Sequence, residues 1–173
     1  MACLATGGTT FSSKASPQQM CLITVYSLKE DTTRIEAMQK QSLNVANSGL
    51  SIVPALVGTP EWWRATEGNS LGRRVVPGII SRVYWGSMGD WPMCEVTADD
   101  GSKSDWTREG DVSRYVEGLR VQFTAVFHPW KIPDQHGLGV TSKIILIVEI
   151  EDSDRRSDPR APGPGGVGLR VRR

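Results

Sequence analysis

His128 and His136 are the side chains of this sequence best suited to proton transfer near neutral pH. They flank a loop that also carries Asp134. A histidine that meets a carboxylate can act as a general acid or base, provided that the two side chains lie within hydrogen-bond distance. Only closeness in sequence supports such a pair here. An enzyme of unrecognised type that uses His128 and Asp134 stays an alternative, and an ordinary loop histidine is the simpler interpretation.

A run of acidic residues could hold a cation or form a catalytic pair. Its five side chains are Asp99, Asp100, Asp105, Glu109 and Asp111. A calcium loop places carboxylates at fixed positions and closes with a glutamate, and this run lacks that spacing. Tight-turn formation accounts for the consecutive Asp-Asp-Gly segment. The sequence also contains no GxSxG, P-loop, GxGxxG or HExxH motif, so we expect neither a catalytic set, a metal site nor a cofactor.

The cysteines give no evidence of a metal or disulfide framework. There are three, Cys3, Cys21 and Cys94, with no CxxC spacing. A zinc framework needs closely spaced Cys or His ligands, and small secreted scaffolds carry many more cysteines. We therefore expect reduced thiols in a cytoplasmic protein, with Cys21 and Cys94 acting as small core hydrophobes.

Tryptophan is the most unusual feature of the composition. All six tryptophans lie between residues 62 and 130: Trp62, Trp63, Trp85, Trp91, Trp106 and Trp130. Exposed aromatic rings stack on nucleic-acid bases, with about 1–3 kcal/mol per base, or on sugar rings. Buried rings would instead fill the interior and cap the ends of a small barrel. The sequence leaves both uses open.

The leading hypothesis is a non-enzymatic binding module that uses one aromatic face. Its predicted ligand-binding residues are Tyr84, Trp91, Trp106, Arg82 and Arg108. Single-stranded nucleic acid is the first expected ligand, because aromatic rings and arginines occur together there. The formal net charge of +1 weakens this hypothesis, since it provides no overall attraction to phosphate. A structural role for Arg108, as the ion-pair partner of Glu109 or Asp111 at a strand end, fits the sequence equally well.

The alternative is a protein-interaction or homo-oligomer assembly role. Trp62, Trp63 and Trp85 would then form an apolar patch that docks a protein partner or a second copy of the chain. No membrane partner is expected, because the longest strongly apolar run, Ile144–Val148, has only the length of a strand.

These residues must be positioned by a single globular domain, which we predict over residues 20–152. Residues 1–19 are small and polar, and residues 153–173 are rich in Pro, Gly and Arg. Both ends offer little to bury, so we predict disordered tails. The C-terminal tail is either a basic arm that touches phosphate or simply solvated.

The N-terminal part of the domain, residues 20–70, reads as strand, helix, loop and helix. β-branched residues predict a strand over 20–28. Asp31 or Thr32 can cap the helix that follows, and Thr59 can cap a short helix from Pro60 to about Glu67.

The remainder, at about residues 75–152, alternates in a way typical of strands. Strands are predicted at 75–85, 91–98, 103–107, 119–128 and 143–152, with one or two helical turns near 111–117. This order predicts an α+β, mainly β fold: a small five-stranded OB-like barrel, alternatively SH3-like, with the helical portion packed on it. Alternation places Ile79, Val83 and Trp85 on its core side and Arg82 and Tyr84 outside.

Overall fold

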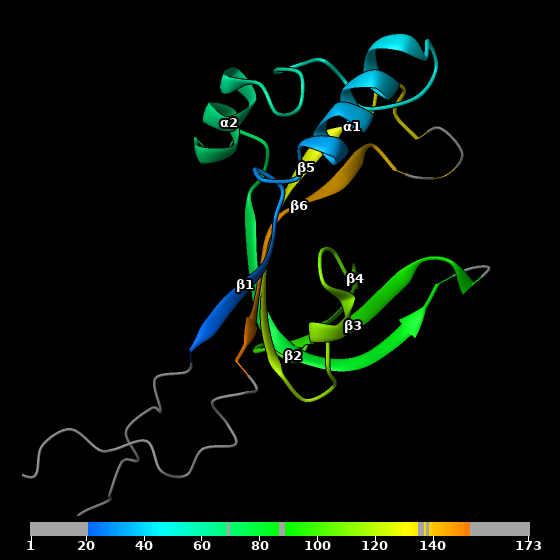
Figure 1. Ribbon diagram of the computed structural model, residues 1–173. Helices are drawn as coiled ribbons and strands as arrows, with labels where there is room; N and C mark the ends of the chain where they lie inside the picture. Colours follow the sequence, from blue (N-terminus) through cyan, green and yellow to red (C-terminus); the bar gives the residue numbers. More distant parts are fainter. Residues whose placement is uncertain (1–20, 69, 87–88, 135–136, 138, 153–173) are drawn as a thin grey trace, which may run out of the picture.

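A computed structural model describes residues 21–68, 70–86, 89–134, 137 and 139–152 of the chain. The fold is α+β and mainly β, as predicted. The structure consists of one open antiparallel sheet with two helices at one end (Figure 1). In chain order the elements are β1 (Leu22–Ser27), α1 (Thr32–Asn44), α2 (Pro60–Glu67), β2 (Arg74–Trp85), β3 (Pro92–Ala98), β4 (Lys103–Thr107), the 3-10 turn η2 (Val112–Arg114), β5 (Arg120–Pro129) and β6 (Thr141–Glu151).

Both helices begin at predicted capping residues. The Asp31 carboxylate accepts a hydrogen bond from the backbone N–H of Arg34 at 3.0 Å, which starts α1. The Thr59 hydroxyl accepts one from Trp62 N–H at 3.3 Å, and Pro60 occupies the first turn of α2. Each cap satisfies a backbone donor that has no partner inside the helix.

The predicted closed barrel, whether OB-like or SH3-like, is wrong. The strand order is β1-β6-β5-β2-β3-β4, so the sheet has six strands and its two edges do not pair. The strand near residue 25 belongs to this sheet and not to a separate helical portion. Its register runs from Leu22 opposite Glu151 to Ser27 opposite Ile147. β1 thereby occupies the edge of β6 that β4 would need in order to close a barrel.

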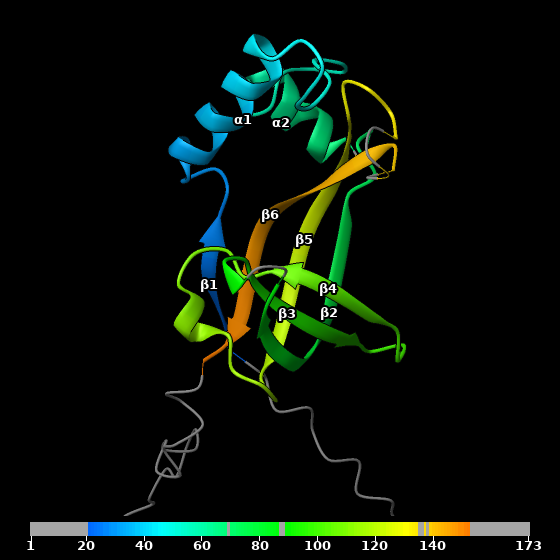
Figure 2. The same cartoon turned by 90° about the vertical axis from the view of Figure 1, so that its right-hand side faces the viewer.

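A bend in β2 divides the sheet into two parts. Residues before the bend pair with β5, and residues after it pair with β3. Gly78 lies at the change of partner, opposite Val121 on one side and Ala98 on the other. A Cβ atom at Gly78 would lie 2.5 Å from the carbonyl oxygen of Thr97. Only glycine fits this approach, and beyond it the second half of β2, β3 and β4 form an arm that crosses the other strands (Figures 1 and 2).

The arm and the helices cover opposite faces of β5. Phe123 of β5 stacks on Trp106 of β4, with ring centroids 4.4 Å apart. Side chains alternate along a strand, so His128, five residues later, points to the other face. There it contacts Trp62 of α2. In Figure 2 the helices lie over the upper end of the sheet and the arm crosses its lower half. The buried residues on both faces of the sheet belong to one hydrophobic cluster. The arm covers one face of this cluster and the helices cover the other.

A β-bulge at Ser81 overturns part of the predicted alternation in β2. Ile80 pairs with Val96, but Arg82 pairs with Glu95, so one extra residue lies between them. Ile80 is fully buried and Ile79 is 44% exposed, the reverse of the prediction. After the bulge, Val83 returns to the core side and Arg82 and Tyr84 lie outside, as predicted. A single inserted residue inverts the alternation, because strand side chains repeat every two residues.

The predicted tails, with Cys3, lie outside the described residues, and so does His136. No helix in the described part of the chain is long and apolar enough to span a membrane.

Candidate functional site

The outer face of the arm brings together most of the predicted ligand-binding residues. The strand register aligns Tyr84, Met93 and Thr107 in one row across the arm. Arg82, Glu95 and Asp105 form the neighbouring row. A groove of about 610 Å³ opens here, and we call it the outer groove. Its lining residues are Tyr84, Gly86, Asp90, Trp91, Met93, Asp105 and Thr107.

Hydrogen bonds hold the aromatic rings of the outer groove in place. The Tyr84 hydroxyl donates to Asp105 Oδ1 at 2.6 Å, and this bond raises the pKa of Tyr84. Trp91 Nε1 donates to the Thr107 hydroxyl at 3.3 Å. The Arg82 guanidinium lies 4.3 Å from the centroid of the Tyr84 ring, in cation–π geometry. The rings are therefore oriented before any ligand arrives.

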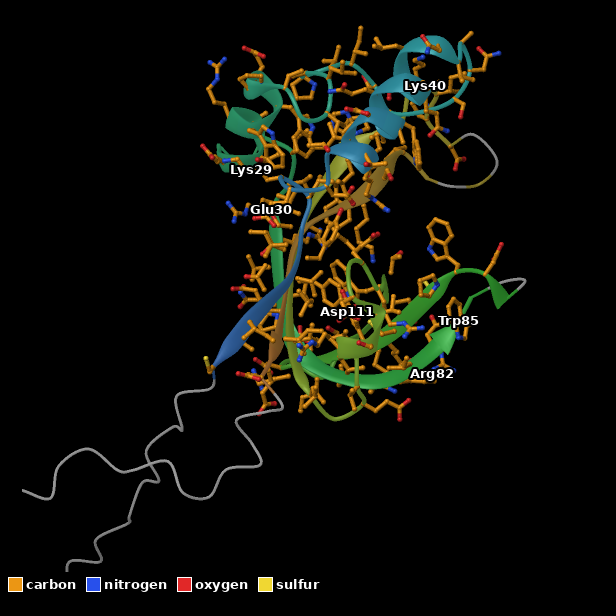
Figure 3. All side chains as sticks on the ribbon, in the orientation of Figure 1. Lys29, Glu30, Lys40, Arg82, Trp85 and Asp111 are labelled. Carbon is orange, nitrogen blue, oxygen red and sulfur yellow. The ribbon has the colours of Figure 1, made fainter. Side chains whose placement is uncertain are left out.

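Trp85 is the last residue of β2 and lies near the tip of the arm (Figure 3). It is 58% exposed, and the Arg108 guanidinium lies 5.4 Å from its ring centroid. Arg108 itself is buried and donates to the carbonyl oxygens of Tyr84 and Val112, both at 3.4 Å. Arg108 therefore ties the tip of the arm to η2.

The predicted ion pair of Arg108 with Glu109 or Asp111 is wrong. Glu109 contacts Arg34 at 2.8 Å, and Asp111 contacts Arg114 at 3.8 Å. Their carboxylates thus have other cationic partners, while Arg108 bonds to backbone oxygens. Neighbours along a strand end point in different directions, so closeness in sequence did not predict the pairing.

The other predicted tryptophans do not join this surface. Trp106 is 3% exposed and stacks in the core, so it offers no ring to a ligand. Trp62 is fully buried, and the half-buried Trp63 packs edge-on against it with ring centroids 4.8 Å apart. Trp85 lies on the arm, away from α2 (Figures 1 and 3). The patch of Trp62, Trp63 and Trp85 proposed from the sequence is therefore not a continuous surface.

His128 has a structural environment, not a catalytic one. It is fully buried, with Trp62 Nε1 donating to its Nδ1 at 3.2 Å and its Nε2 lying 2.7 Å from the carbonyl oxygen of Ser51. Nε2 must carry the proton for both bonds to form. Asp134 instead accepts a hydrogen bond from Gly139 N–H inside its own loop. The His128–Asp134 pair of the enzyme alternative is therefore not formed.

The described residues contain no group of three His, Cys, Asp or Glu side chains that could hold a metal ion. Burial raises the pKa of the Cys94 thiol to about 12, which keeps it protonated at neutral pH.

Sequence reasoning missed Asp90, Met93, Asp105 and Thr107 as groove residues. The turn after β3 could have revealed three of them. It sets the register that places Thr97 opposite Lys103, and hence Glu95 opposite Asp105 and Met93 opposite Thr107. In a hairpin the turn fixes which side chains share a face.

A family model described as "Immunity protein RhsI2" matches residues 22–151, from the start of β1 to the end of β6. No curated protein matches the chain.

Proposed function

The chain belongs to the RhsI2 immunity protein family, and on that basis we propose that it neutralises an Rhs toxin by binding it. Immunity through binding requires a protein interface, which agrees with the protein-interaction alternative drawn from the sequence. We propose further that the arm of β2, β3 and β4 carries this interface.

Exposed tryptophan at the arm is the observation that supports this assignment. Trp85 is 58% exposed and Trp91 is 52% exposed, while Trp62 and Trp106 are buried. Tryptophan, tyrosine and arginine dominate the binding energy of protein interfaces. Tyr84 lines the outer groove together with Trp91, and Arg82 stacks on Tyr84. A partner that covers large exposed aromatic rings removes apolar surface from water, which favours binding.

The charges of the outer face favour a protein over nucleic acid. Glu95 and Asp105 lie in the same row as Arg82, and Lys103 pairs with Glu95 at 3.0 Å. Nucleic-acid binding relies on a surplus of cations facing phosphate, which this mixed surface lacks. The burial of Trp106 also removes one of the rings expected to stack on bases.

A growth assay followed by a binding measurement tests the proposal. Individual Rhs toxin domains are expressed in bacterial cells with and without this protein. Growth should be restored only in cells that express the toxin domain this protein recognises. Isothermal titration of that purified toxin domain should then show binding. If no Rhs toxin domain is neutralised or bound, the proposed function is wrong.

The arm is tested by the double substitution Trp85→Ala and Trp91→Ala. We expect it to weaken toxin binding by about 100-fold or more, because interface tryptophans typically contribute strongly. The matched control is Ile52→Ala with Val53→Ala, which truncates two other exposed apolar side chains, 56% and 68% exposed. Equal affinities of the double variant and the wild type would place the interface elsewhere.

A further inference from the structure

The outer groove combines aromatic rings with negative charge. Two of its lining residues are carboxylates, Asp90 and Asp105, and two are aromatic, Tyr84 and Trp91. None of the described lining residues is Lys or Arg. We infer that the outer groove binds a lysine or arginine side chain of the toxin; this inference rests on the proposed toxin-binding function.

Trp91 offers a ring face that no described cation occupies. The same surface already shows how a guanidinium binds, since Arg82 lies 4.3 Å from the centroid of the Tyr84 ring. The Trp91 indole is oriented by its bond to Thr107 and is half exposed. Tryptophan is the best aromatic partner for a cation, so an incoming Lys or Arg can stack there. Met93, beside it in the groove, would contact the apolar stem of that side chain.

The carboxylates provide the second half of the recognition. Asp105 Oδ1 accepts the Tyr84 hydroxyl, which leaves Oδ2 for a cation. Asp90 is exposed and pairs with no cation among the described residues. The carboxylate forms an ion pair with the cationic group of the side chain, and the face of the aromatic ring stacks on the same group.

The cations near the groove are engaged by other groups. Arg82 stacks on Tyr84, and Lys103 pairs with Glu95 at 3.0 Å. Lys143 donates to the backbone carbonyl of Asp105 at 2.7 Å and lies over the Trp106 ring on the inner side of the arm. None of these three lines the groove, so its own charge is negative.

The experiment uses the Rhs toxin domain identified in the growth assay. Asp90→Asn and Asp105→Asn remove charge but keep shape, and the amide oxygen introduced by Asp105→Asn can still accept the Tyr84 hydroxyl. We expect each to weaken binding about tenfold, mainly through slower association, with a smaller dependence of affinity on salt. The matched control is Asp100→Asn in the turn after β3, which also removes one exposed carboxylate and keeps an acceptor for Ser102 N–H.

A cycle of paired substitutions identifies the occupant. Each surface Lys and Arg of the toxin is changed to Ala and tested against wild type and Asp105→Asn. We expect one toxin position where the change to Ala weakens binding to the wild type about tenfold. The same change should weaken binding to Asp105→Asn less than about twofold. The inference is overturned if the wild type binds but Asp90→Asn and Asp105→Asn bind as well as Asp100→Asn, or if no toxin cation couples to Asp105. Failure of the wild type to bind would instead refute the proposed function.

Discussion

At the scale of single residues, His128 shows how a polar side chain can become part of a core. Its two ring nitrogens join α2, through Trp62, to the segment after α1, through the carbonyl of Ser51. Burial lowers the pKa of His128, so the neutral form is the one that the fold requires. An imidazole with both nitrogens bonded holds these two segments together, which a solvated loop histidine would not do.

This environment predicts that the fold loses stability in mild acid. The unfolded chain takes up a proton on His128 near its ordinary pKa of about 6.5, whereas the folded chain resists protonation. The free energy of unfolding should therefore fall as pH decreases below about 6.5 and level off below the lowered pKa of the folded state. Urea unfolding at about pH 8 and about pH 5.5 measures the difference. In His128→Gln the difference should shrink, and an unchanged pH dependence would show that another group is responsible.

At the scale of elements, the shape of β2 determines where the candidate site lies. The bend at Gly78 turns the strand from β5 toward β3, and the bulge at Ser81 decides which side chains face outward. Without the bulge, Tyr84 and Arg82 would occupy the core face and Trp85 the outer face. The arm and its groove are therefore products of two local irregularities in one strand.

Gly78→Ala should destabilise the protein by about 1–3 kcal/mol, because the added methyl group would push into the backbone of β3. A Cβ there would lie 2.7 Å from Val96 Cγ1 as well as 2.5 Å from the Thr97 oxygen. Denaturant unfolding provides the measurement. Gly68→Ala, at the end of α2, is the control, because its nearest contact, the Arg64 oxygen, lies at 3.3 Å. Equal stabilities of the two variants would contradict the proposed close approach.

At the scale of the whole molecule, the two edges of the sheet are joined without strand pairing. The segment after β4 crosses to β1, where Gly110 packs against the carbonyl of Val25 and the side chain of Tyr26. Beside it, Glu109 is 9% exposed and contacts Arg34 of α1 at 2.8 Å. Burial raises the pKa of Glu109 even though Arg34 opposes this shift. The Glu109–Arg34 contact thus links the arm to the helical end across the open side of the sheet.

Arg34→Met should cost about 1–3 kcal/mol, less than for a fully buried pair because the Arg34 side chain is 41% exposed. The loss arises because Glu109 would stay buried without a cation. Adding Glu109→Gln removes the buried charge, so the double variant should recover part of the stability. Thermal unfolding of the two variants and wild type is the measurement. A double variant less stable than Arg34→Met alone would indicate that the ion pair is not the cause.

The elements of this protein follow from local chemistry, and they were predictable for that reason. Caps at Asp31 and Thr59, the Asp-Asp-Gly turn and the strand patterns of β5 and β6 each involve residues close in sequence. Such signals act within one turn or one strand, where the neighbouring residues are known.

The sheet and the candidate site depend on contacts between distant residues, which only the tertiary structure decided. The sequence could place Trp62, Trp63, Trp85 and Trp106 on their elements, but it could not separate core from surface. Trp106 is buried because β4 curls onto Phe123, whereas Trp85 and Trp91 are exposed because no described residue covers the tip of the arm. The physical reason is that one bulge and one bend redirect every side chain that follows them, and neither leaves a periodic signal in the sequence.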